Sequence, residues 1–313
     1  MTKYITLLLS FFPLFLFAQE DLDYEKPPRE YSYETFSATR VINNNSIETL
    51  EGKTMLFYVT HRFGDFYTEE GNVIHELFGL DQATDIVIGL DYGITNNITI
   101  GAGRAKGAGQ QRELWYGHVK YKFLSQTTDN KIPVSMSLYA NAVVSGAKKL
   151  SGSDESAGYI EKGVHRFSYF TELIIARKFN PWFSLQVSAA YLHRNKVPYA
   201  DENNMVAFGA ATRIKVSKVV AFLLETYIPV SDFRLNEKHQ EDRGVDFPYD
   251  IPFGVGIEFK TGKHVFDINF TNAEGILPND FIPYSQKSWL DGGFRFGFTI
   301  SREFPIGKYP YKK

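Results

Sequence analysis

The stretch that decides the fold lies near the C-terminus and reads Phe294-Arg295-Phe296-Gly297-Phe298-Thr299-Ile300-Ser301. Large apolar residues alternate here with small or polar ones. Successive side chains of a β-strand point to opposite faces, so the pattern predicts a strand with one apolar and one polar face. Eleven further segments alternate in the same way. The twelve predicted strands cover residues 54–63, 85–92, 98–104, 113–124, 134–145, 166–178, 183–194, 205–216, 220–229, 253–260, 264–271 and 292–302.

With the single weak exception of residues 125–133, the connections between these strands alternate between long and short. The longest cover residues 64–84, 146–165, 231–252 and 272–291, and the tightest cover residues 93–97, 179–182, 217–219 and 261–263. Barrels of the bacterial outer membrane have short periplasmic turns and longer external loops. The chain is therefore predicted to be an all-β, antiparallel transmembrane barrel with both termini in the periplasm. The alternative, a soluble β-sandwich or barrel, has no reason to keep its long loops at one end.

Composition agrees with an exported barrel. Aromatic residues make up 16% of the 313 residues, and membrane barrels use them at both water interfaces. The chain has no cysteine, which excludes disulfides, thiolate metal sites and cysteine catalysis. Its net charge of -2 gives no basic field for nucleic acid.

The N-terminus reads as a secretory signal. Lys3 precedes an apolar run over residues 4–17, and the small residue Ala18 follows. The run is shorter than the ~20 residues of a spanning helix. We therefore predict a signal peptide over residues 1–18, cleaved after Ala18. The rest is predicted to divide into an N-terminal periplasmic segment or plug (residues 19–53), the barrel (54–304) and a periplasmic tail (305–313).

The same alternation assigns the two faces of the wall. A lipid-facing Arg or Lys at mid-depth costs ~2–4 kcal/mol, so the charged positions of the strands are predicted to face the lumen. These are Asp85, Asp91, His118, Lys120, Lys122, Arg166, Glu172, Lys178, Arg194, Arg213, Lys215, Glu225, Glu258, Lys260, Asp267 and Arg295. Either this lumen is wet and passes small polar solutes, or its acids and bases pair and close it. In the second case the barrel would dock a periplasmic or surface partner.

Residues 31–50 have some strand character but no clear partner, so they are predicted to be a plug or a segment packed below the barrel. Arg40 is the one lysine or arginine in this stretch. It is the candidate plug contact, and we expect it to form an ion pair with an anion of the lumen.

Enzyme and metal chemistry find little support. A membrane lipase would need a serine, a histidine and an acid together, but none of the seven histidines lies in such a run. His75-Glu76 and His239 are better explained as solvated loop residues than as metal ligands. The glycine-rich stretch 101–109 leads into a strand and lacks the helix N-terminus that a phosphate loop needs. We expect no catalytic residue and no cofactor.

The chain also resembles a known family. The similar stretches are 35–43 with Ser46, Glu48 and Thr49, then 61–64, 78–81, 91–95 and 100–104. They resemble an outer-membrane β-barrel family of Bacteroidota that is known only as a domain of unknown function. The resemblance implies a barrel in the outer membrane and a shared role for residues 35–49 as a plug or periplasmic contact. It implies no catalytic residues.

Overall fold

The computed structural model describes residues 30–67, 74–109, 111–148, 160–198, 201–242, 244 and 246–306. The predicted signal peptide and most of the predicted C-terminal tail lie outside these residues. Within them, no helix is long and apolar enough to cross a membrane.

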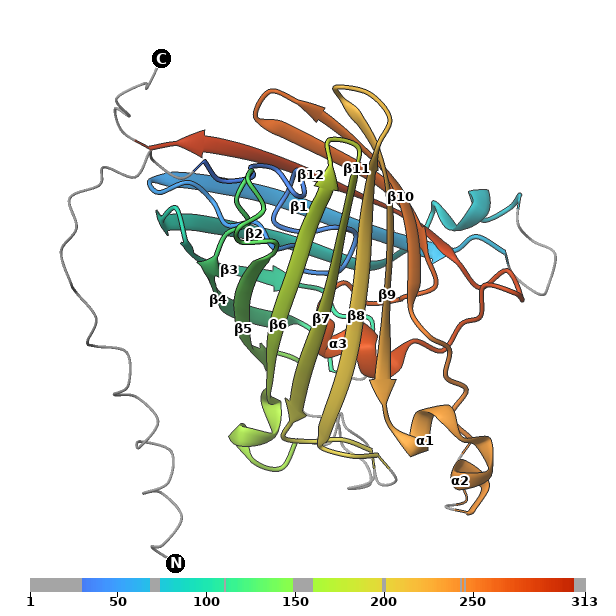
Figure 1. Ribbon diagram of the computed structural model, residues 1–313. Coiled ribbons are helices and arrows are strands. Elements are labelled where there is room, and N and C mark those ends of the chain that lie inside the picture. The colour runs from blue at the N-terminus through green and yellow to red at the C-terminus, as the bar shows by residue number, and fades with distance from the viewer. Residues whose placement is uncertain are drawn as a thin grey trace, which may run out of the picture. The chain divides into compact units, whose positions relative to one another are not determined.

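Twelve antiparallel strands close into one barrel, each pairing with its neighbours in sequence (Figure 1). They are β1 (Thr54–Asp65), β2 (Ala83–Thr95), β3 (Ile98–Ala105), β4 (Leu114–Leu124), β5 (Ser135–Ser145), β6 (Phe167–Asn180), β7 (Phe183–Arg194), β8 (Asn204–Lys215), β9 (Val220–Val230), β10 (Phe253–Thr261), β11 (His264–Thr271) and β12 (Arg295–Pro305). Short helices lie in the connections: η1 (Leu77–Gly79), η2 (Gly163–Arg166), α1 (Asp232–Leu235), α2 (Glu237–Asp242) and α3 (Pro278–Tyr284).

The predicted fold class and strand number are confirmed. Ten of the twelve predicted strands differ from the observed ones by no more than two residues at either end. The last strand begins three residues later than predicted, at Arg295. The preceding residues form a turn, in which the Gly293 N–H donates to the Ser288 carbonyl and Gly292 has φ +74°. A positive φ favours glycine and interrupts the extended chain.

Closure is made by β1 and β12, the two ends of the meander. Val59 pairs with Ile300 and Thr60 with Thr299, and the two threonine hydroxyls hydrogen bond at 3.0 Å inside the barrel. An up-and-down meander places alternate connections at opposite ends, so the longest connections share one end and the tightest turns the other. The chain enters β1 and leaves β12 at the short-turn end.

The wall has the two faces that the alternation predicts. On β12, Ile300 is 42% exposed, whereas its neighbour Ser301 is buried. On β2, Ile88 and Leu90 are exposed, whereas Asp91 is 2% exposed. Apolar side chains outside and charges inside are the arrangement that a bilayer requires.

This arrangement predicts a large cost for a charge at the middle of β12. Ile300→Arg should destabilise the barrel in bilayers by ~2–4 kcal/mol, because a cation would face hydrocarbon. The measurement is urea unfolding in lipid vesicles, with Ile300→Val as the matched control. Equal stability of the two variants would contradict the assignment of this face to lipid.

Candidate functional site: the filled lumen

The interior of the barrel is occupied by residues 31–50, here called the inserted segment. In Figure 1 it is the blue coil inside the half of the barrel that carries the short turns. Its apolar residues Phe36, Val41, Ile42 and Ile47 are buried. They pack in one cluster with Ile174, Ala176, Ala211 and Leu223 of the wall.

The segment is not part of the sheet. Its tip is a tight loop, in which the Val41 N–H donates to the Asn44 carbonyl at 2.9 Å and Ser46 donates to Thr39 at 3.0 Å. Within the described residues, its bridges are Arg40 with Asn45, inside the loop, and Tyr31 with Thr127, in the connection between β4 and β5. No ladder of strand hydrogen bonds joins the described segment to the wall, so other contacts must fix it.

The carboxylate of Glu225, on β9, holds the tip. It accepts the successive backbone N–H groups of Ile42, Asn43 and Asn44, with shortest distances of 3.1, 2.8 and 2.9 Å. Consecutive N–H groups of a turn form a concave nest that binds anions. Glu225 is 4% exposed, so this charge is buried and satisfied largely by the segment's backbone.

Lys120, on β4, holds the other side of the loop. Its ammonium donates to the carbonyl oxygens of Thr39, Ser46 and Glu48, at 2.9, 2.8 and 3.1 Å. An ammonium group has three donors, and here each finds a backbone acceptor. Wall charges of both signs therefore bind the main chain of the segment.

Further wall side chains fix the loop through amides. Gln186 donates to the Asn45 carbonyl at 2.7 Å and accepts the Ile47 N–H at 3.2 Å. The Asn45 side chain donates to Glu172 at 3.2 Å. Arg62, which is 0% exposed, donates to the Asn43 side chain at 2.7 Å. These contacts specify one position for the tip.

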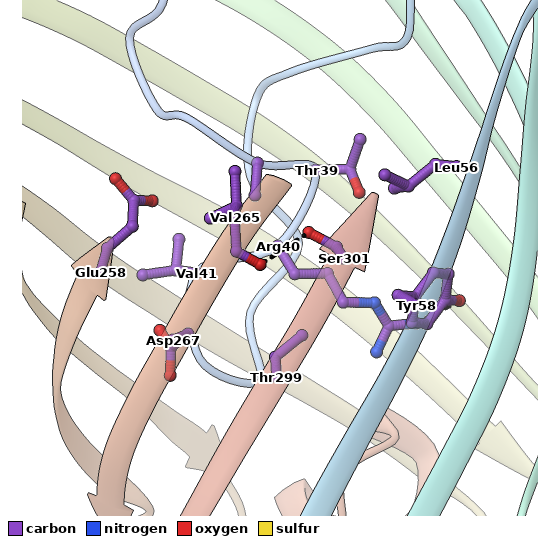
Figure 2. A pocket seen from close by; sticks show the side chains of 11 residues that line it. Thr39, Arg40, Val41, Leu56, Tyr58, Glu258, Val265, Asp267, Thr299 and Ser301 are labelled. Atoms are coloured by element: carbon purple, nitrogen blue, oxygen red, sulfur yellow. Dashed lines mark hydrogen bonds between the residues drawn. The ribbon is translucent and has the colours of Figure 1, made fainter. Parts of the chain in front are cut away.

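Among the described residues, Arg40 makes no direct salt bridge with a lumen anion, although it lines one small cavity together with the buried Asp91. The Arg40 guanidinium donates to the Tyr58 hydroxyl at 3.3 Å and lies 5.0 Å from the centre of that ring (Figure 2). Glu225 and Lys120, which bind the backbone of the segment, are therefore its principal charged contacts with the wall.

The structure places most predicted lumen charges in the buried interior: Asp85, Asp91, His118, Lys120, Glu172, Arg194, Arg213, Glu225, Glu258, Asp267 and Arg295. Only some of these form direct pairs, such as Arg213 with Glu258 at 2.9 Å and His118 with Asp91 at 3.6 Å. Lys215 is partly buried at the end of β8.

Three predicted lumen lysines lie where the inserted segment leaves the barrel. Lys122 pairs with Glu48 at 3.2 Å, Lys260 pairs with Glu34, and Lys178 donates to the Tyr33 carbonyl at 2.8 Å. Arg166 is an exception to the strand prediction. It belongs to η2 and donates to the carbonyls of Ser145 and Ala147 at the opposite rim, because the chain still turns there before β6.

The other half of the lumen is occupied by the connection from β11 to β12. The prediction of an external loop over residues 272–291 is wrong for this part, because α3 folds into the barrel (Figure 1). Ile276, Leu277, Phe281 and Ile282 are buried at 2% exposure or less. Because the burial of apolar side chains is favourable, these four residues are more stable inside the barrel than exposed to water.

Carboxylates again hold this insertion through backbone groups. Asp280 of α3 accepts the N–H groups of Ala108 and Gly109 at 2.8 and 2.9 Å. Asp85 of β2 accepts those of Gly107 and Ile276 at 2.9 and 3.0 Å. A side chain at Gly109 would place its Cβ 2.1 Å from an Asp280 oxygen, so a larger residue there would displace this carboxylate. The glycine-rich stretch thus receives a carboxylate rather than a phosphate.

Two arginines, Arg194 at the end of β7 and Arg234 of α1, bind one aspartate beside α3. Asp201 accepts from Arg194 at 2.9 Å and from Arg234 at 2.7 Å, and Arg194 also donates to the Tyr284 hydroxyl. Burial raises the pKa of Asp201, but the two guanidinium groups outweigh it and hold the pKa below its usual value. This contact is therefore retained at neutral pH and lost only in acid.

Asp280 responds to pH in the opposite sense. Burial and the carboxylate of Asp85 raise the pKa of Asp280 to about 7, although two N–H groups favour its charged form. A raised pKa stabilises the docked loop at low pH, and this contribution is lost as pH rises from about 4 through 7. Amides of residues 276–284 should exchange with deuterium more slowly at pH 5 than at pH 8, after correction for intrinsic rates. Asp280→Asn should remove most of the difference, and an unchanged difference would contradict this role.

Catalysis or metal binding would need histidine and acidic side chains grouped around one point. His118 contacts Asp91 inside the lumen, but no serine in the described part of the chain hydrogen bonds to it. Among the described residues, no group of three or more His, Asp or Glu side chains is placed to hold a metal ion.

Comparison with known proteins gives one family and several solved barrels. The profile of the family described as Membrane bound beta barrel domain (DUF5777) matches residues 36–304. No curated protein that was compared matches the sequence. The structure is similar to a NanC porin, at 8% identity and TM-score 0.44, over 80% of this chain and 98% of that one. It is also similar to an outer membrane channel from Pseudomonas putida F1, at 10% identity and TM-score 0.44, over 83% and 98%.

Proposed function

The chain belongs to this family of membrane-bound β-barrel domains, and on that premise we propose that it is a closed outer-membrane channel for small polar solutes. In the state described here, the inserted segment and α3 fill the lumen. Passage requires that the inserted segment leave its place and that α3, in the other half of the lumen, move aside. The chain acts without a cofactor and without catalysis.

One observation carries this proposal. Charged side chains of the wall bind the inserted segment, but the described segment forms no strand-to-strand hydrogen bonds with the wall. The segment can therefore leave without breaking the hydrogen bonds that close the barrel. The wall that it exposes carries Glu225, Lys120, Arg62 and Glu172, which water solvates well. A barrel with a purely structural interior would gain more from an apolar core.

Recording of the reconstituted mature chain in planar bilayers tests the proposal. We expect a mostly closed barrel with brief openings, because the segment is held by many contacts but by no covalent link at its tip. A chain that never conducts, even when the segment is absent, would reject the channel.

The proposed orientation puts the long loops outside and both termini in the periplasm. Protease added to intact cells should therefore cut within residues 64–84, 146–165 and 231–252. It should spare the short turns 179–182 and 261–263, and also α3, which is buried in the lumen. Mass spectrometry of the released peptides makes the measurement. Cleavage in the short turns of intact cells would reverse the orientation.

A second candidate is a non-conducting barrel that docks a periplasmic or surface partner. The insertion of α3 favours it, because removal of the N-terminal segment would leave Phe281 and Ile282 in the other half of the lumen. A closed barrel in every condition, together with specific capture of a periplasmic protein, would support this alternative.

A further inference from the structure

Four lysines gather at the short-turn end of the lumen, on four of the strands that run toward that end. Each follows, two residues later, a buried position of its own strand, so its side chain starts from the inward face of the wall. All four are partly buried. They are here called the mouth lysines: Lys122 of β4, Lys178 of β6, Lys215 of β8 and Lys260 of β10.

Two glutamates of the inserted segment already bind two of the mouth lysines. Glu48 pairs with Lys122 at 3.2 Å, and Glu34 pairs with Lys260. The other Glu48 oxygen accepts the Thr35 N–H at 2.9 Å, so this ion pair also holds the part of the segment that leaves the barrel. The Glu34 side chain is 50% exposed and that of Glu48 is 18% exposed. Carboxylates therefore occupy the mouth lysines at a place that dissolved anions can reach.

The other two mouth lysines have no carboxylate of their own. Lys178 donates to the Tyr33 carbonyl at 2.8 Å, and within the described part of the chain the Lys215 ammonium forms no ion pair or hydrogen bond. Both lysines are close enough to Glu34 to interact with its charge. Four ammonium groups thus face two carboxylates, which leaves an excess of two positive charges in this group.

Neighbouring charges do not cancel this excess, because they are paired with each other. Arg213 pairs with Glu258 at 2.9 Å, and Lys263 pairs with Glu303 at 3.0 Å. An anion with one carboxylate would compete poorly with the two glutamates of the segment, because the chain holds them at a high local concentration. An anion with several carboxylates can bind more of the mouth lysines at once than either glutamate does.

We propose that the mouth lysines bind small organic anions that carry several carboxylates, in place of Glu34 and Glu48. The inference rests on the proposed function and names a class of ligand that regulates it. An anion that takes Lys122 and Lys260 releases the two glutamates, and so loosens the segment where it leaves the barrel. The contacts of the tip stay in place, so binding makes release of the segment easier without completing it.

Calorimetry with propane-1,2,3-tricarboxylate tests the inference, on the full mature chain in detergent micelles at pH 7 and low ionic strength. The double variant Glu34→Gln/Glu48→Gln removes both competing charges and keeps the oxygen that accepts the Thr35 N–H. We expect this variant to bind the tricarboxylate at least about tenfold more tightly than the parent chain does, because the tethered competitors are gone. Added salt should weaken the binding, because it screens partly exposed charges.

Two further substitutions test which lysines bind the anion. Lys178→Gln together with Lys215→Gln should remove the gain of the glutamine variant. Lys131→Gln together with Lys218→Gln is the matched control, because both lysines are exposed at the same end and lie outside the lumen. The neutral propane-1,2,3-tricarboxamide should not bind to any of these chains.

Heat-modifiable migration in electrophoresis checks that each variant is folded, and Glu34→Gln alone gives the same comparison with a smaller gain if the double variant does not fold. Equal affinity of the parent and the glutamine variant, full affinity without Lys178 and Lys215, or equal affinity for the tricarboxamide would each overturn the inference. Tricarboxylate binding by a barrel that never conducts would reject the channel alone, and conduction without such binding would reject this inference alone.

Discussion

Removal of residues 31–50 should leave a folded barrel and raise its single-channel conductance several-fold. The twelve strands close through β1 and β12 without help from the segment, so folding does not depend on it. Its removal exposes a polar wall around the half of the lumen that it occupied. Single-channel recording in planar bilayers, with the parent chain measured in parallel, gives the result.

A matched control replaces residues 31–50 by a glycine-serine linker of equal length, which keeps the tether but loses the contacts with Glu225 and Lys120. This variant should conduct like the deletion, because the contacts and not the chain length close the lumen. Equal conductance in the parent, the linker variant and the deletion would show that the segment does not limit passage. In that case α3 would be the constriction.

The wall of the barrel could be predicted from sequence because a strand has a period of two. Each position on β12 from Phe296 to Ser301 alternates between lipid and lumen, and the structure follows the alternation. The lengths of the connections also predicted the order of the strands, since a meander must place alternate connections at opposite ends. Both signals are local, so neither depends on knowing what lies in the lumen.

The contents of the lumen could be predicted only in part. The position of residues 31–50 was an open alternative, and α3 was mistaken for an external loop. The apolar residues Ile276, Leu277, Phe281 and Ile282 were the available signal, because a solvated loop would not carry four of them so close together.

The way in which the segment is held could not be predicted, because the partners of Glu225 and Lys120 are backbone atoms. Side-chain patterns carry no record of which N–H or carbonyl groups a loop will present. Reasoning from charges alone therefore selected Arg40, whose guanidinium instead lies on Tyr58. The charged residues of the wall were candidates from the sequence, but the backbone groups that each of them binds could not be predicted.

The same geometry makes Glu225 the residue whose loss should most strongly release the segment. Glu225→Ala removes the acceptor of three successive N–H groups at the loop tip. Each buried donor left unpaired costs about 1–3 kcal/mol, so docking of the tip should weaken by several kcal/mol even if water satisfies some of them. The barrel itself should persist in this variant, because the backbone at position 225 still pairs with Ala211 and Gly254 on the neighbouring strands.

We therefore expect Glu225→Ala to conduct nearly as well as the deletion, and amides 42–44 to exchange with deuterium much faster than in the parent chain. Glu225→Gln should be intermediate, since one carbonyl oxygen still accepts but the charge is gone. Glu303→Gln is a control for the loss of an acid, because Glu303 pairs with Lys263 at the short-turn end and does not contact the tip. Slow exchange at residues 42–44 in Glu225→Ala would mean that Lys120, Gln186 and the apolar cluster hold the tip without the carboxylate.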